Sequence, residues 1–127
     1  MLYHRESLLY YYSILYRNIM AGSSDDRDSL LSRHSEFREG CPYTRCFSHA
    51  EITDMLHRMG FDISDIYTDS VVYDEGIHRK LDGNKIFSVE PTGIYDIDLF
   101  FKTYNCAVAS GSNLDAWGWH LLVTSVK

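Results

Sequence analysis

Three consecutive residues near the N-terminus, Tyr3, His4 and Arg5, have side chains well suited to bind or deprotonate a small molecule. They fall at the carboxyl end of an expected strand, which is where open α/β sheets bind their ligands. The His4 imidazole is therefore a candidate catalytic base, and Tyr3 and Arg5 are candidate substrate-binding residues. The alternative is a surface histidine at the entry to a helix, because the sequence assigns no carboxylate partner to His4.

A second candidate pair, Tyr43 and Arg45, lies in the segment CPYTRC that precedes a predicted helix. A guanidinium suits a planar carboxylate or a phosphate, so Arg45 is a candidate for pairing with an anionic substrate. The same side chain equally suits a structural role, in which it anchors the segment to Glu51 or to a helix C-terminus. Both interpretations stay open.

The cysteines permit a zinc site but do not favour one. Cys41 and Cys46 have four residues between them, Cys106 lies sixty residues further on, and His49 is close to the pair. Structural zinc loops usually carry two closely spaced pairs of ligands, whereas this chain has one. We therefore expect free thiols and no bound metal.

A run of tyrosines, Tyr10–Tyr12 followed by Tyr16, allows a stacking platform for an aromatic ligand. Aromatic residues at helical spacing are more typical of a core whose hydroxyl groups reach water. We prefer the core interpretation.

The segment from Gly40 to Phe61 carries the clearest local sequence signals for secondary structure. Ser48 and Glu51 form a capping box, in which each side chain satisfies one free backbone amide at a helix start. Residues at i, i+3, i+4 and i+7 then form an apolar stripe, and Gly60 with Phe61 is typical of a Schellman cap. The stripe consists of Ile52, Met55, Leu56 and Met59.

The remaining patterns predict an α/β fold with helices packed on a short mixed sheet of about three strands. We expect strands at Met1–His4, at Asp62–Thr68 and in the terminal GWHLLVTSVK segment. Helices are expected at about Glu6–Met20, from a cap at Ser24 to near Arg38, and around Ile94–Tyr104. A loop is expected over Asp74–Pro91, and one short turn between Asn113 and Trp117. Both alternating residue sets of the terminal strand are largely apolar, which predicts a central strand buried on both faces.

Composition favours one globular domain, residues 1–127, with 45% hydrophobic residues. A formal net charge of -6 without a basic run argues against nucleic-acid and anionic-membrane surfaces. The apolar runs are too short to cross a bilayer. Three cysteines without a preceding secretory leader suit a reducing compartment, so we expect a cytoplasmic protein.

The order of these pieces resembles the C-terminal part of class I S-adenosylmethionine-dependent methyltransferases. In that family a P-x-T-R-x-[FY]-[ST] segment precedes a helix ending in GF, and a GWxLLVxxxK strand closes the chain. The matching residues here are Pro42, Thr44, Arg45, Phe47, Ser48, Glu51, Gly60, Phe61, Gly118, Trp119 and Lys127.

The resemblance implies a partial Rossmann-like fold that holds the fifth, sixth and seventh strands of the family, with the seventh antiparallel between the other two. It also implies that Tyr43 and Arg45 help to close an acceptor pocket. The family binds S-adenosylmethionine with a Gly-rich turn after its first strand, and the GSNLDAWG cluster near the C-terminus does not fit that pattern. We therefore expect the cofactor-binding half to be missing and no cofactor to be bound by this chain alone.

Two functions follow as alternatives. The first is a methyltransferase family member, a truncated C-terminal portion that has no independent activity and faces a small-molecule acceptor. The second is a non-catalytic interaction module derived from the same fold. Such a truncation would leave the edge of the first strand bare, which predicts a homo-oligomer formed through that edge.

Overall fold

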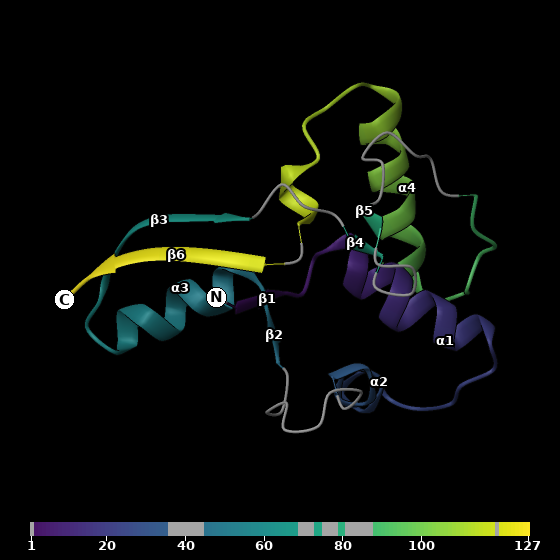
Figure 1. The fold of residues 1–127 in the computed structure, drawn as a ribbon, viewed down its shortest axis with the longest axis horizontal. Coiled ribbons are helices and arrows are strands. Elements are labelled where there is room, and N and C mark those ends of the chain that lie inside the picture. Colours follow the sequence, from purple (N-terminus) through teal and green to yellow (C-terminus); the bar gives the residue numbers. More distant parts are fainter. Residues whose placement is uncertain (1, 36–44, 69–72, 75–78, 81–87, 119) are drawn as a thin grey trace.

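A computed structural model of the protein describes residues 2–35, 45–68, 73–74, 79–80, 88–118 and 120–127. Two lobes are visible in Figure 1. One lobe contains two long strands and a helix, from residues 49–68 and 120–127, and we call it the wing. The other lobe consists mainly of helices, from residues 9–35 and 95–109, and we call it the body.

The described residues form one four-stranded mixed sheet in the order β2-β1-β6-β3. Its strands are β1 (Leu2–His4), β2 (Cys46–Phe47), β3 (Asp62–Thr68) and β6 (His120–Val126). β6 is antiparallel to both β1 and β3 and lies between them, which confirms the predicted position of the terminal strand. The α/β class is also as predicted.

The sheet has four strands rather than the expected three, because a short strand was missed. β2 pairs in parallel with β1, and the Arg5 amide donates a hydrogen bond of 2.9 Å to the Phe47 carbonyl. The edge of β1 that we expected to be bare is therefore covered. A two-residue strand carries too little sequence pattern to be predicted, and it forms because β1 offers a row of unpaired backbone groups.

Helix α3 (His49–Arg58) forms as its sequence predicts, with both hydrogen bonds of the capping box. The Ser48 hydroxyl accepts from the Glu51 amide at 3.2 Å, and the Glu51 carboxylate accepts from the Ser48 amide at 2.8 Å. At the other end Gly60 has a φ of 80°, and the Phe61 amide donates to the Leu56 carbonyl. This is the predicted Schellman cap.

The expected first helix exists but is mostly a π-helix. η1 (Leu9–Tyr16) continues directly into α1 (Arg17–Met20), and the Arg17 amide donates to the Tyr12 carbonyl five residues back. Six side chains of the segment 8–15 are buried, namely Leu8, Leu9, Tyr10, Ser13, Ile14 and Leu15. A segment that is apolar on nearly every side is packed by its neighbours, so tertiary contacts rather than an amphipathic stripe set its winding.

Two further helices complete the body. α2 (Arg27–Ser35) starts two residues later than a cap at Ser24 predicts, because the Asp26 carboxylate accepts the Ser29 amide at 2.8 Å. The predicted end near Arg38 lies outside the described residues. α4 (Tyr95–Ala109) is longer than the short helix expected, and its residues Ile97, Phe101 and Tyr104 join the core formed by η1 and α2.

The smaller predicted features are partly described. η2 (Asp115–Trp117) is one 3-10 turn at the position where the sequence predicted a turn. At the start of the predicted 74–91 loop, β4 (Tyr73–Asp74) pairs antiparallel with β5 (Arg79–Lys80). Residues 75–78 between these two strands lie outside the description.

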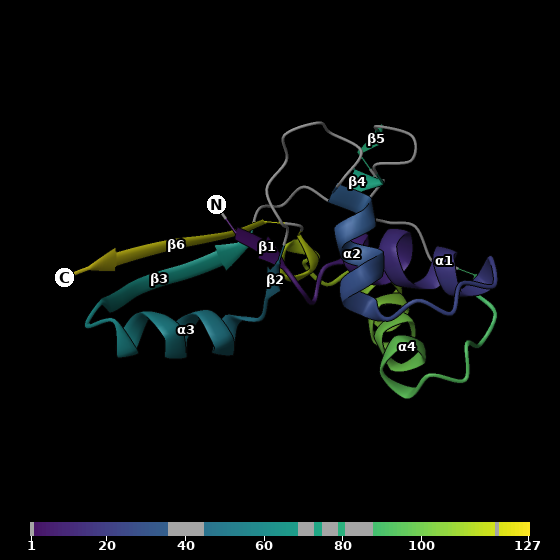
Figure 2. The same cartoon turned by 90° about the horizontal axis from the view of Figure 1, so that it is seen from below.

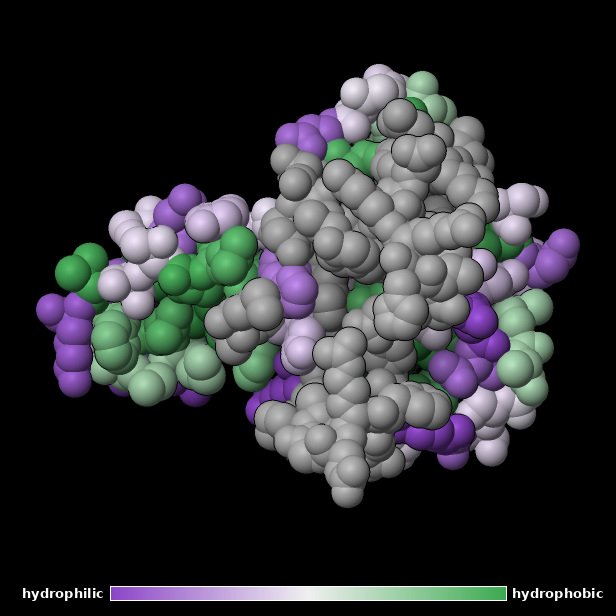
Figure 3. All heavy atoms as spheres, viewed as in Figure 1, coloured by the Kyte–Doolittle hydropathy of each residue, from purple (hydrophilic) through white to green (hydrophobic). Residues whose placement is uncertain are grey.

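In the wing, α3 lies along one face of β3 and β6, and no helix among the described residues covers the other face (Figure 2). Hydrophobic residues gather over these strands in Figure 3. β6 is buried at Leu121 but exposed from Thr124 to Val126, so the expected burial on both faces holds only for its first half. The predicted stripe of α3 is also divided, with Ile52 buried and Met55 and Met59 exposed.

Candidate functional site

A cleft of about 630 Å³ lies where the helical body meets β2. Its lining comes from three separate parts of the chain and is mainly polar. The lining residues are Arg5, Tyr10, Asp26, Arg27, Asp28, Leu31, Arg45 and Cys46. This volume is within the range of small-molecule sites, so the cleft is our candidate functional site.

Two of the five residues singled out from the sequence, Arg5 and Arg45, line this cleft. Tyr3 and His4 do not belong to its lining, and Tyr43 lies outside the described residues. Tyr3 pairs with Cys46 and His120 in the sheet, and its ring lies 5.7 Å from the His120 ring. The structure therefore brings the two predicted arginines together.

Arg5 is held rigidly at the cleft wall. Its guanidinium donates to Glu51 Oε1 at 2.8 Å and to the Cys46 carbonyl at 3.0 Å. These bonds connect the end of β1 to the capping box of α3 and to β2. The Ser48 hydrogen bonds and Arg5 together lower the pKa of Glu51, so the pair stays ionised at neutral pH.

Arg45 is held differently. Its guanidinium lies over the Phe47 ring, 5.1 Å from the centroid, in cation–π geometry. No carboxylate pairs with it among the described residues, so the predicted anchoring to Glu51 is not seen and Arg5 occupies that carboxylate instead. Arg45 therefore contributes an exposed positive charge to the cleft.

The opposite wall is formed by the start of α2. Arg27 makes a bidentate pair with Asp96 of α4, at 2.6 and 2.7 Å, and this interaction lowers the pKa of Asp96. Asp26 is occupied as the helix cap, where its hydrogen bonds with Ser29 lower its pKa. Asp28 is exposed to solvent at the cleft.

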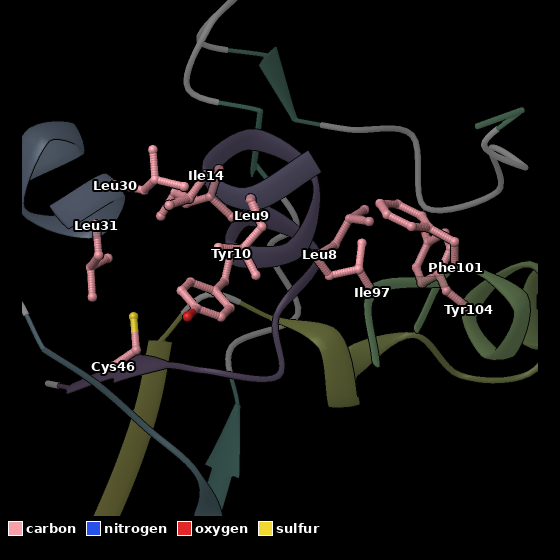
Figure 4. Close-up of a cluster of buried hydrophobic side chains, with 11 residues drawn as sticks. Leu8, Leu9, Tyr10, Ile14, Leu30, Leu31, Cys46, Ile97, Phe101 and Tyr104 are labelled. Carbon is pink, nitrogen blue, oxygen red and sulfur yellow. The ribbon is translucent and has the colours of Figure 1, made fainter. Parts of the chain in front are cut away.

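The floor of the cleft is uncharged at neutral pH. Tyr10 and Cys46 point toward one another from η1 and β2, with Leu31 beside them (Figure 4). Burial raises the pKa of Tyr10 to about 12, and burial also raises the pKa of Cys46 to about 12. A protonated thiol is a poor nucleophile, so Cys46 suits packing rather than covalent chemistry.

His4 is the last residue of β1, with 1% of its surface exposed. Its Nδ1 is 3.0 Å from the Gly118 carbonyl, its ring stacks on His49 at 5.2 Å, and its Nε2 is 3.5 Å from Glu6 Oε2. Burial lowers the pKa of His4 more than the Gly118 hydrogen bond raises it. Glu6 is the carboxylate neighbour that the sequence did not assign, and the role of His4 as a base stays a prediction.

Sequence reasoning missed Asp26, Arg27, Asp28 and Leu31 as cleft residues, and it considered Tyr10 and Cys46 only for an aromatic platform and a zinc site. Each had a local interpretation, either as a core tyrosine or leucine or as part of a helix start. Nothing in their spacing indicates that the start of α2 and β2 line the same cleft, because the sequence does not predict β2. The cluster of charges at the predicted helix start was the one available signal.

The described residues offer no group of three or more His, Cys, Asp or Glu side chains that would hold a metal ion. Of the cysteines considered for zinc, Cys46 is buried, Cys106 is exposed, and Cys41 lies outside the description. Within the same described part of the chain, no helix has both the length and the hydrophobicity needed to cross a membrane.

Comparison with protein-family models, with curated proteins and with solved structures finds no match to this chain. Strand topology and the geometry of the cleft are therefore the observations that bear on function.

Proposed function

We propose that the chain is the substrate-side portion of an S-adenosylmethionine-dependent methyltransferase, with the cleft as its acceptor site and without independent catalytic activity. The observation that carries the proposal is the insertion of β6, antiparallel, between β1 and β3. This is the strand order that the sequence resemblance implied. Under this proposal, the four-stranded sheet corresponds to the carboxyl-terminal part of a Rossmann-like fold.

The position of the cleft supports the acceptor role. Arg5 directly follows β1, and ligands of open α/β sheets bind beyond the carboxyl ends of their strands. Catalysis in such a site would consist mainly of holding the acceptor in line with the methyl donor. The cleft residues fit this role, since they offer fixed hydrogen-bond donors and a neutral floor but no activated nucleophile.

Four glycines among the described residues have a positive φ, and their positions bear on the cofactor part of the proposal. Gly22, Gly60 and Gly111 follow helices, and Gly93 lies in the turn before α4. None of these four opens a helix directly after a strand, which is the arrangement that cradles a dinucleotide-like cofactor.

Isothermal titration of the chain with S-adenosylmethionine tests the cofactor part of the proposal. We expect no binding at micromolar concentrations. Micromolar binding would show that the cofactor site is complete within these residues and would overturn that part. The coding sequence upstream of Met1 tests the family assignment, because we expect an open frame encoding a Gly-rich strand-turn-helix unit, and an immediate stop codon would count against it.

The second candidate is a non-catalytic module that self-associates through the wing. It is favoured by the exposed apolar side chains there, Met55, Met59, Tyr67 and Val126, and by the outer edge of β3, which has β6 as its one strand neighbour among the described residues. Sedimentation velocity at increasing concentration tests this candidate. A monomer throughout would eliminate it, whereas a dimer that Met59→Lys dissociates would support it.

A further inference from the structure

The charged groups of the cleft divide into occupied and available ones. Arg5 and Arg27 are neutralised by Glu51 and Asp96, and Asp26 is occupied as the cap of α2. Asp26 keeps its negative charge, but both of its carboxylate oxygens accept hydrogen bonds from Ser29. The Arg45 guanidinium and the Asp28 carboxylate are then the two charged groups available to a ligand. Neither has an ion-pair partner among the described residues, and both line the same cleft.

One available cation and one available anion form a matched pair of binding groups. They come from different elements, since Arg45 directly precedes β2 and Asp28 belongs to the first turn of α2. The floor between these elements is apolar or neutral, formed by Tyr10, Leu31 and Cys46. A ligand that satisfies both charges must therefore carry opposite charges joined by a carbon skeleton.

We propose that the cleft binds a small zwitterion, an amino acid or related aminocarboxylate, with its carboxylate on Arg45 and its ammonium on Asp28. This inference takes the acceptor role from the proposed function and names the acceptor's chemical class. A guanidinium binds a carboxylate through two parallel hydrogen bonds, and an ammonium donates to an aspartate in the same charge-assisted manner.

Singly charged ligands and phosphates fit less well. An isolated anion would face the carboxylates of Asp26 and Asp28, and a doubly charged phosphate would be repelled more strongly than a carboxylate. An isolated cation would meet the uncompensated charge of Arg45. A ligand that carries both charges avoids these two repulsions, because its carboxylate is placed on Arg45 and its ammonium faces the carboxylates.

The test is a titration of the whole chain followed by two-dimensional ¹H–¹⁵N NMR. The probes are L-leucine with its two matched analogues, 4-methylpentanoate and isoamylamine, and a series of ω-aminocarboxylates from glycine to 6-aminohexanoate. We expect roughly millimolar zwitterion binding with shifts at the Arg45 and Asp28 amides, and at least about tenfold weaker binding of both singly charged analogues.

Two variants separate the contributions. Arg45→Gln is expected to remove the preference of the cleft for L-leucine over isoamylamine. Asp28→Asn is expected to remove the preference of the cleft for L-leucine over 4-methylpentanoate. Arg58→Gln and Asp54→Asn change charge by the same amounts in an exposed pair on α3, away from the cleft lining, and are expected to leave binding unchanged. Far-UV circular dichroism verifies that each variant is folded.

Equal binding of L-leucine and 4-methylpentanoate would overturn the proposal in favour of a simple anion site. The absence of binding by every zwitterion of the series at 50 mM, a concentration on the order of ten times the expected dissociation constant, would also overturn it. All titrations are done without S-adenosylmethionine. Zwitterion binding without a methyltransferase-like upstream sequence would support this inference and reject the proposed function. A methyltransferase-like upstream sequence without zwitterion binding would reject only this inference.

Discussion

The body and the wing are built on different principles. The body buries a continuous cluster of apolar side chains contributed by η1, α2 and α4, with β2 supplying Cys46. The wing consists of two long strands and α3, and its fully buried side chains among the described residues are Ile52 and Leu121. Neither of these two belongs to the body cluster.

The two lobes therefore contribute differently to stability and to recognition. A segment such as η1, apolar on nearly every side, requires burial by several partners and therefore nucleates a core. An amphipathic pair of strands with one helix requires only one partner and leaves apolar surface outside. The cleft lies at the margin of the body, where charged residues from three elements surround a packed floor.

The largest expected effect is the loss of a body side chain. Leu15→Ala should lower the free energy of unfolding by about 2–5 kcal/mol, because it removes a completely buried leucine and leaves a cavity. Urea denaturation measures this change. Met59→Ala in the wing is the control, since 59% of that side chain is exposed and its loss should cost less than about 0.5 kcal/mol. Equal losses would erase the distinction between the lobes.

A buried wing residue tests whether the wing opens separately. Ile52→Ala should expose the amides of β3 and β6 to hydrogen exchange while those of η1 and α4 stay protected, because Ile52 lies outside the body cluster. Exchange followed by mass spectrometry reports both lobes in one experiment. If protection falls uniformly, the two lobes unfold as one cooperative unit.

The capping box is the next smaller contribution. Ser48→Ala removes the oxygen that accepts the Glu51 amide and should cost about 1 kcal/mol in the free energy of unfolding. The matched control is Ser125→Ala, at an exposed position of β6, with an effect below about 0.5 kcal/mol. An Ser48→Ala variant as stable as the control would mean that α3 is held by its packing alone.

The smallest effect is a pH dependence from His4. Burial lowers its pKa below the ordinary value of 6.5, so the unfolded chain binds more protons than the folded one around that pH. Stability should therefore be complete above pH 6.5 and decrease as the pH falls toward the folded-state value. Urea denaturation at pH 7.5 and pH 5.5 measures the slope, and His4→Asn should reduce it whereas His57→Asn, on the exposed face of α3, should not. An unchanged slope in His4→Asn would contradict the assignment.

Local sequence signals predicted those parts of the fold whose interactions are local. The capping box, the Gly60 cap, the β-branched and aromatic residues of β3 and the two apolar residue sets of β6 each involve residues close in sequence, so their patterns are readable. The two apolar sets predicted the central position of β6, whereas its antiparallel direction came from the family resemblance. The π-helical winding of η1 and the β2 strand were missed, because both result from contacts between distant segments.

For the site, the sequence by itself identified two charged residues, Arg5 and Arg45, as candidates for binding a substrate, with Arg45 suited to an anionic group. Only the tertiary structure decided which of them is available, because Arg5 pairs with Glu51 whereas Arg45 has no carboxylate partner among the described residues. Packing also placed Asp28 in the same cleft as Arg45. Charge type is a property of each residue, whereas charge compensation depends on which distant residues the fold brings within a few ångströms.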